Sequence, residues 1–189
     1  MSWSVPAAIN AVVTIGILAL TTSCSLEYGV EDSEAVDASV PNSIVVGYRH
    51  TVVESDGSRV TIEAQRAEYY RNTEEQHLTE ISFEAFDSDG ELLVSGSAAR
   101  ALIELDTNNA DLSGGVEMDS RSQGAQVSSE TLYWDEESRI LSSDRETVVT
   151  IVRDNGTRIE GRGFVTDLSL NVMRFEGGAS GVIYREGQP

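Results

Sequence analysis

The sequence predicts an all-β protein, folded as a twisted, open β-jelly-roll or sandwich of two antiparallel sheets. Proline does not occur between residues 42 and 188, and proline is excluded from central strands because it cannot donate a ladder hydrogen bond. Over the same residues, runs of alternating apolar and polar side chains are separated by Gly, Asn and Asp turn signals. That pattern is typical of consecutive β-strands.

The first 23 residues carry no charged side chain. An apolar run of 16 residues, 5–20, is followed by Thr21, Thr22 and Ser23, directly before Cys24. This pattern is similar to a bacterial lipoprotein signal, in which Cys24 becomes the acylated first residue. An uncleaved membrane anchor and a plain signal peptide are the alternatives, although the run is shorter than the roughly 20 residues that a spanning helix needs. All three interpretations carry residues 25–189 out of the cytoplasm.

Residues 24–42 are predicted to be an acidic, flexible spacer, because residues 26–41 contain five carboxylates and no basic side chain. The whole chain has a formal net charge of −19. Such an acidic surface argues against binding to nucleic acid, whose phosphates require Lys and Arg. It also argues against adsorption to anionic lipid head groups by charge. Any contact with lipid is therefore expected to be apolar or covalent.

The folded domain is predicted to span residues 43–185. Turns are expected at Asp56-Gly57, Asp89-Gly90, Asn108-Asn109, Asn155-Gly156 and Gly177-Gly178, since these residues tolerate positive φ. The best candidate for a helix, residues 63–71, fits a strand equally well. The predicted strands are residues 44–48, 50–54, 60–64, 77–86, 92–96, 101–105, 110–118, 131–134, 140–143, 148–152, 157–165, 167–175 and 181–184.

A loose internal repeat is present. The small residues Ala64, Ala98, Ser129 and Gly161 lie 34, 31 and 32 residues apart, and each precedes apolar residues, a polar turn and a returning strand. Such spacing predicts a stack of hairpin units. Because each unit is too thin to bury its own apolar face, the stack is expected to fold into two facing sheets.

No cluster of residues predicts catalysis, a metal site or a cofactor. His50 and His77 stand in separate strands without ligand-spaced partners. Residues 87–90 begin like a calcium loop, but a strand follows where further ligands are needed, so a turn is expected. Residues 161–164 lack the helix and third glycine of a phosphate cradle, and are expected to allow a close approach to the backbone. We therefore predict a protein that is not an enzyme and needs no cofactor or metal.

Residues 128–167 carry the motifs of a known family. The strings LYWD (residues 132–135) and ILSS (140–143), followed by VVTI (148–151) and DNGTRIEGRGFVTD (154–167), resemble the LptC family, the periplasmic component of the lipopolysaccharide export ABC transporter. The resemblance extends over residues 43–184. It implies a twisted β-jelly-roll whose splayed sheets form a V-shaped apolar groove for acyl chains, and attachment to the inner membrane by an N-terminal helix or lipid.

The resemblance also implies a set of site residues. The resemblance implies a lipid-binding groove, and strand alternation indicates which side chains share its face. Each methylene group of an acyl chain that moves from water into such a groove stabilises binding by about 0.8 kcal/mol. The N-terminal edge, with Ile44, Val46 and Tyr48, would meet the LptF/LptG-like membrane subunits of the transporter. The C-terminal edge, with Val182 and Tyr184, would meet an LptA-like bridge protein. The groove residues are Ile62, Ile81, Phe83, Leu132, Trp134, Phe164, Leu168 and Leu170.

The sequence therefore predicts a periplasmic, membrane-anchored protein that receives lipopolysaccharide or a related glycolipid from an ABC transporter and passes it to the bridge. The alternative is an outer-membrane or surface lipoprotein, whose closed β-sandwich binds other proteins. Ser25 favours this alternative, because an aspartate after the acylated cysteine retains lipoproteins at the inner membrane in enteric-type bacteria.

Overall fold

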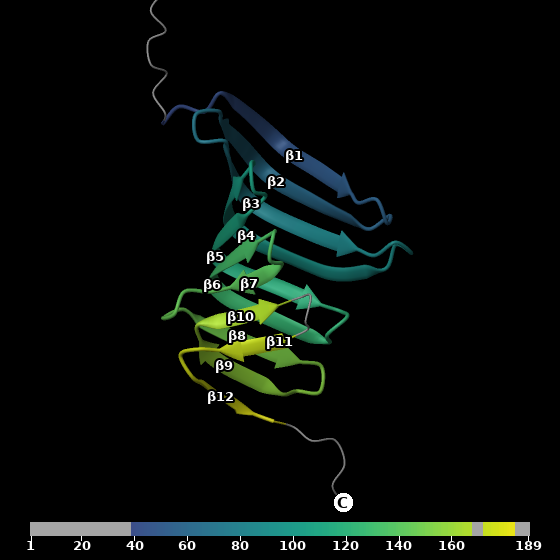
Figure 1. The fold of residues 1–189 in the computed structure, drawn as a ribbon, viewed down its shortest axis with the longest axis vertical. Helices are drawn as coiled ribbons and strands as arrows, with labels where there is room; N and C mark the ends of the chain where they lie inside the picture. The colour runs from purple at the N-terminus through teal and green to yellow at the C-terminus, as the bar shows by residue number, and fades with distance from the viewer. Residues whose placement is uncertain (1–38, 168–171, 184–189) are drawn as a thin grey trace, which may run out of the picture. The chain divides into compact units, whose positions relative to one another are not determined.

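The computed structural model describes residues 39–167 and 172–183, and the described residues contain strands but no helix. The prediction of an all-β fold is confirmed. In the described residues twelve strands follow one another from β1, dark blue in Figure 1, to β12, in yellow. They are β1 (Ser43–Val53), β2 (Arg59–Tyr70), β3 (Glu75–Phe86), β4 (Leu92–Glu104), β5 (Ala110–Ser120), β6 (Ala125–Asp135), β7 (Ile140–Ser142), β8 (Val148–Arg153), β9 (Arg158–Arg162), β10 (Phe164–Asp167), β11 (Val172–Phe175) and β12 (Ala179–Val182).

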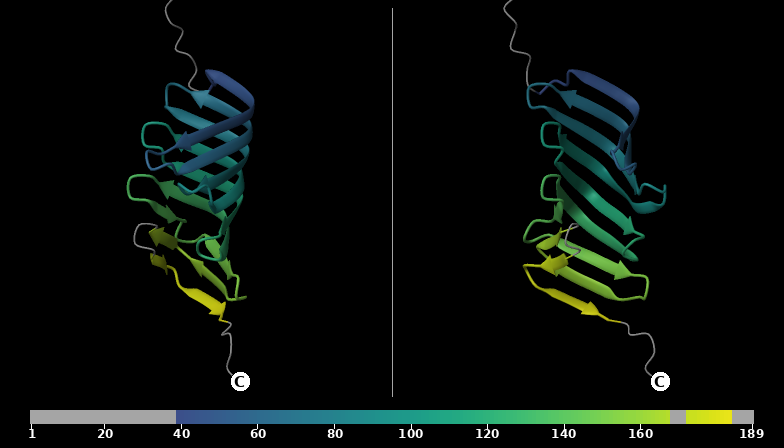
Figure 2. Two further views of the ribbon diagram at one scale, coloured as in Figure 1. Left: turned by 90° about the vertical axis from the view of Figure 1, so that its right-hand side faces the viewer. Right: turned by 45° about the vertical axis from the view of Figure 1, so that its right-hand side comes forward.

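The strands form one antiparallel sheet that forks at β6. From β1 to β6 each strand pairs with the next one in the chain. Beyond that point residues 133–135 of β6 pair with β7, whereas residues 125–129 pair with β8. One branch continues through β7, β10 and β11, and the other through β8, β9 and β12. Figures 1 and 2 show the long strands stacked side by side, with the shorter ones continuing the stack. The jelly-roll prediction agrees with this arrangement, although the described strands form one continuous sheet where two facing sheets were expected.

A line of irregular positions crosses the long strands near their middles. The ladder pairing skips Gly47 in β1, Gln65 in β2 and Glu80 in β3, and the register shifts again in β4 to β6 near Ala99, the Gly114-Gly115 pair and Glu130. Four of these residues have positive φ, namely Gly47, Glu80, Gly114 and Gly115. Unpaired, positive-φ positions are where β-strands bulge and turn. We call this line the bend.

The bend divides the sheet into two arms. Arm A contains residues 43–46, 66–70, 75–79, 100–104, 110–113 and 131–135 with β7, β10 and β11. Arm B contains residues 48–53, 59–64, 81–86, 92–97, 116–120 and 125–129 with β8, β9 and β12. Gly163, between β9 and β10, also has positive φ, so the bend continues into the C-terminal strands.

The buried core lies on one face, which we call the inner face, in the two rows of side chains next to the bend. On arm A the row is Ala67, Leu78, Ala101, Leu112 and Leu132, each the ladder partner of the next, and all five are buried. On arm B the row contains Ala64, Ile81, Ala98, Val116, Ser129, Val149 and Gly161, which are buried as well.

The internal repeat of the sequence has a structural cause in this arm B row. Its four small residues, Ala64, Ala98, Ser129 and Gly161, belong to β2, β4, β6 and β9, and all lie beside the bend. One repeat is therefore one hairpin. The strands between them place Ile81, Val116 and Val149 in the same row, so small and large side chains alternate and the interior fills closely.

Several strands are longer than the sequence predicts, because the bend interrupts their alternation. The predicted strands 44–48 and 50–54 merge into one strand, β1, which ends at Val53 and has Gly47 at the bend. The predicted strands 92–96 and 101–105 likewise merge into β4, which ends at Glu104. In β2 the buried alanines Ala64 and Ala67 are three residues apart, a spacing that breaks the period of two. Because a spacing of three residues also occurs on one face of a helix, the apolar pattern of residues 63–71 fitted a helix as well as a strand.

The predicted turns are confirmed by backbone geometry. Gly57, Gly90 and Gly156 all have positive φ, between 81° and 92°. At Asp87 the carboxylate accepts hydrogen bonds from the backbone N–H of Asp89 at 3.0 Å and of Glu91 at 2.9 Å. Residues 87–90 therefore form a turn, as expected, and the carboxylate is used to hold it.

Candidate functional site

The inner face carries a second row of apolar side chains, one step further from the bend. On arm B, Ile62, Phe83 and Met118 are half-buried, and on arm A, Ile103 and Trp134 are half-buried. One step further out again, Val60 and Val52 expose 38% and 41% of their surface. In β1 to β5 the apolar inner face therefore becomes more exposed with distance from the bend.

The C-terminal part of the inner face is more tightly closed. In the second row of arm B, Val127 of β6 and Ile151 of β8 are buried, and in the second row of arm A, Leu141 of β7 is buried. Phe164 and Phe175 lie beside the bend with their ring centroids 5.6 Å apart. The exposed apolar surface of the interior is thus concentrated over β2 to β5, with Trp134 of β6 at its border.

The predicted groove residues divide into two groups. Ile81, Leu132 and Phe164 are buried beside the bend, whereas Ile62, Phe83 and Trp134 are half-buried in the second row. The structure brings these six residues onto one face. Leu168 and Leu170 lie outside the described residues.

Two inner-face residues, Ile103 and Met118, were absent from the predicted groove. Both belong to strands that the sequence analysis had found. Steps of two from the buried Leu112 lead through Gly114 to Val116 and Met118, so alternation along β5 could have placed Met118 on the inner face. In β4 the buried Ala98 and Ala101 are three residues apart, so alternation from the first half of the strand does not reach Ile103.

Glycines let two aromatic rings lie close to the sheet. A Cβ on Gly96 would lie 2.4 Å from the Phe83 ring and 2.8 Å from the backbone oxygen of Glu117. A Cβ on Gly161 would lie 2.5 Å from the Phe175 ring. The sequence analysis expected a close approach to the backbone at residues 161–164, and the Phe175 ring is what makes it.

Both predicted partner edges are terminal strands among the described residues. β1 pairs only with β2, and β12 only with β9. At the β1 edge, Ile44 and Val46 expose 48% and 75% of their surface, while Tyr48 is half-buried and packs against the core. Val182 of β12 is 59% exposed, and Tyr184 lies outside the described residues. An exposed apolar edge strand can pair with another chain.

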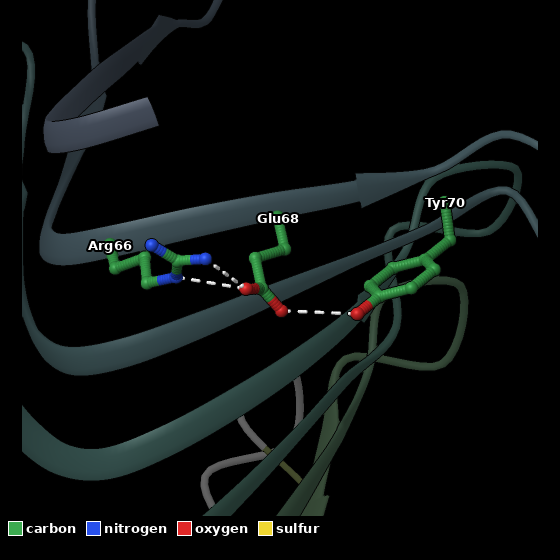
Figure 3. Close-up of polar contacts among 3 residues, drawn as sticks. All are labelled: Arg66, Glu68 and Tyr70. Atoms are coloured by element: carbon green, nitrogen blue, oxygen red, sulfur yellow. Dashed lines mark hydrogen bonds and ion pairs between the residues drawn. The ribbon is translucent and has the colours of Figure 1, made fainter. Parts of the chain in front are cut away.

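The opposite, outer face is polar and carries a connected group of side chains, of which Figure 3 shows Arg66, Glu68 and Tyr70. Nε of Arg66 donates to Oε1 of Glu68 at 2.8 Å, and the Tyr70 hydroxyl donates to Oε2 at 3.0 Å. These hydrogen bonds, the one from Arg66 first, lower the pKa of Glu68. The Tyr70 ring lies 4.5 Å from the His77 ring, and His77 contacts Glu75 at 3.1 Å. An ionised carboxylate whose two oxygens both have partners stabilises the strand surface and is poorly suited to act as a base.

A shallow polar depression also lies on the outer face. It is lined mainly by the serines of β3 and β4 and by carboxylates, and its lining residues include Ser82, Ser95, Ser97, Glu63, Glu84, Glu117 and Asp119. The described residues contain no group of three His, Cys, Asp or Glu side chains arranged to hold a metal ion. In the described part of the chain, no helix has the length and apolar character needed to cross a membrane.

Asp111, on the outer face of β5, gives a pH-dependent prediction. Partial desolvation of this exposed side chain, followed by repulsion from Glu104 and Asp144, raises the pKa of the carboxyl. A raised folded-state pKa means that the folded protein holds this proton more tightly than the unfolded chain, so stability is lost as pH rises through that range. Asp111→Asn is therefore expected to raise the melting temperature at pH 7, and the gain should shrink as pH falls towards about 3, where the aspartate is protonated in both states. Thermal melts of both proteins from pH 3 to 8 measure the difference, and an equal gain at all pH values would contradict it.

Comparison with known proteins agrees with the geometry of the sheet. No curated protein matches the sequence. The family described as "Lipopolysaccharide-assembly, LptC-related" matches residues 9–184, which is nearly the whole chain. The residues that carried the resemblance, 128–167, form β6 to β10 and supply the buried Leu132, Leu141 and Phe164. This protein therefore belongs to the LptC-related family and has a role in lipopolysaccharide transport.

Proposed function

We propose that the protein receives lipopolysaccharide or a related glycolipid from an ABC transporter at its β1 edge and passes it to an LptA-like bridge at its β12 edge. The acyl chains would lie against the inner face of β2 to β5, between the two arms, while the sugars stay in water. The chain would act outside the cytoplasm, anchored to the inner membrane by acylated Cys24 or by its apolar N-terminal segment. Energy would come from the ATPase of the transporter.

The observation that carries this proposal is the gradual exposure of the apolar inner face. In a closed β-sandwich, side chains from both sheets interdigitate and the inner rows are buried throughout. Here the rows beside the bend are buried, but Ile62, Phe83, Met118, Ile103 and Trp134 in the next rows are half-buried. A V-shaped opening, with the bend at its base, would produce this gradient. Half-exposed apolar side chains facing such an opening are suited to acyl chains, each methylene of which gains about 0.8 kcal/mol on leaving water.

A direct test measures uptake of a fluorescent lipid A analogue by the purified full-length chain, together with glycolipid delivery in cells from which the protein is depleted. We expect saturable uptake in the first experiment and accumulation of glycolipid at the inner membrane in the second. If the purified chain takes up no analogue, and if glycolipid delivery continues in the depleted cells, the transport role is ruled out.

Docking at the β1 edge has its own expected result. Val46 is 75% exposed, so Val46→Arg should leave folding within about 0.5 kcal/mol of the original. A charge on an edge strand opposes pairing with another chain, so affinity for the periplasmic domains of LptF/LptG-like subunits should fall at least about tenfold. Biolayer interferometry with those domains measures the change. Ser82→Arg, which adds the same side chain and the same charge to the exposed outer face of β3 away from the edge, is the matched control.

A second candidate is a surface lipoprotein with a closed, protein-binding sandwich. The burial of Val127, Leu141 and Ile151 favours it, because this part of the interior has no exposed apolar row. Protease treatment of intact cells separates the two functions. A protein at the inner membrane is protected by the outer membrane, whereas a surface lipoprotein is digested.

A further inference from the structure

One hydrogen bond joins the two arms across the interior at the β1 end of the sheet. The hydroxyl of Tyr48 donates to Oε1 of Gln76 at 3.3 Å, between residues 28 apart in the chain. Tyr48 belongs to arm B, on the second half of β1. Gln76 belongs to arm A, where its ladder partners are Tyr69 and Ile103. Both side chains lie on the inner face, since Tyr48 and Ile103 pack against the buried core.

The local sequence makes this contact possible. Tyr48 and Gln76 are on β1 and β3, so the tyrosine ring must pass over β2, which lies between them. The inner-face residues of β2 beside the bend are Ala64, the ladder partner of Tyr48, and Ala67. Longer side chains at these two positions would occupy the path of the ring. Gly47, with φ of +68°, turns the strand immediately before Tyr48.

The Tyr48 ring also has an aromatic neighbour. The imidazole of His50 is stacked on Tyr48, with ring centroids 6.2 Å apart and the planes 18° from parallel. Phe83 of β3 and Ile103 of β4, which are half-buried on the inner face, lie further from the β1 edge, whereas Ile62 of β2 is the ladder partner of His50. The contact between Tyr48 and Gln76 therefore lies between the free β1 edge and Ile103 of β4.

We propose that Tyr48 and Gln76 form a latch across the β1 end of the interior, which must open for an amphiphile to enter from that edge. This inference rests on the proposed function and adds the two residues that control entry. A single neutral hydrogen bond that is partly exposed contributes little net stability, so the latch can open without unfolding the strands. Its effect is on the rate of entry and on the separation of the arms.

The test compares three variants of the full-length chain with one control variant. Tyr48→Phe and Gln76→Leu each remove the hydrogen bond and keep a side chain of similar size. Each is expected to raise the rate of uptake of a fluorescent lipid A analogue about fivefold, the factor that one ordinary hydrogen bond is worth. The double variant should be no faster than either single one, because both remove the same bond. Tyr70→Phe removes a hydroxyl, with its hydrogen bond to Glu68, from the outer face of β2 and should leave the rate unchanged.

A second readout separates failure of the latch from failure of the transport proposal. Spin labels at Val53, at the end of β1 in arm B, and at Arg71, just after β2 in arm A, report the separation of the arms in a Cys24→Ser background. Tyr48→Phe is expected to broaden this distance distribution towards longer values, whether or not lipid is added. If uptake is absent from every protein but the distance changes, the transport proposal fails and the latch stands. An unchanged distance with unchanged uptake rates overturns the latch.

Discussion

Replacing Phe83 by glutamate is expected to lower glycolipid uptake at least about tenfold while the protein stays folded. Phe83 is half-buried in the second row of arm B, where water can still reach it. A carboxylate is therefore tolerated in the free protein, but acyl chains that cover it would strip its water at a cost of several kcal/mol. Uptake of the fluorescent lipid A analogue, with circular dichroism as the check of folding, measures the effect.

Ser82→Glu is the matched control for this substitution. Ser82 precedes Phe83 on β3 and is exposed on the outer face, because successive side chains of a strand point to opposite faces. It adds the same charge to an already acidic chain at almost the same position. Uptake should change less than about twofold, since this side chain does not meet the acyl chains. Equal losses in the two variants would mean that charge, and not the inner face, governs uptake.

Replacing Phe164 by alanine is expected to lower the free energy of unfolding by about 3–5 kcal/mol. Phe164 is only 1% exposed and packs against Phe175, with ring centroids 5.6 Å apart. Its removal leaves a cavity beside the bend where the last strands turn from arm B into arm A. Such a loss is a large part of the about 5–15 kcal/mol that stabilises a typical domain.

Urea denaturation followed by circular dichroism measures this loss. Val46→Ala is the control, because Val46 is 75% exposed and its truncation should cost no more than about 0.5 kcal/mol. A loss below about 1 kcal/mol for Phe164→Ala would mean that the C-terminal interior is loosely packed. It would also remove the contrast between a closed C-terminal part and a more open part over β2 to β5.

The fold class could be predicted from local sequence because turns and alternation are local properties. Asp56-Gly57, Asp89-Gly90 and Asn155-Gly156 are turns in the structure, with each glycine at positive φ. The strands beside them follow from β-branched and alternating residues. The family resemblance at residues 128–167 is confirmed by a match over residues 9–184.

The bend could not be predicted, because it depends on how neighbouring strands are aligned. Gly47 and Gly114-Gly115 were visible in the sequence, but Gln65, Glu80 and Glu130 carry no local signal. A bulge in one strand forces its neighbours to adjust their register. The consequence was that β1 and β4 were each predicted as two strands.

The shared face of the predicted groove residues could be predicted only in part, for the same reason. Ile62 and Phe83 lie on an uninterrupted stretch on one side of the bend, so alternation placed them correctly on one face. The partnership of Tyr48 with Gln76 joins residues from opposite arms, and no sequence pattern contains it. Tyr48 was assigned to the partner edge, and the structure adds that its side chain turns inwards.

The central claim, that acyl chains lie against the inner face between the arms, is tested most directly by photo-crosslinking in cells. A photoreactive amino acid is placed at Phe83 on arm B, at Ile103 on arm A and, as the control, at Ser82 on the outer face. Glycolipid adducts are expected at Phe83 and Ile103 and not at Ser82. Adducts at none of the three in a folded protein, or equally at all three, would contradict the account, because the inner face would then hold no lipid of its own.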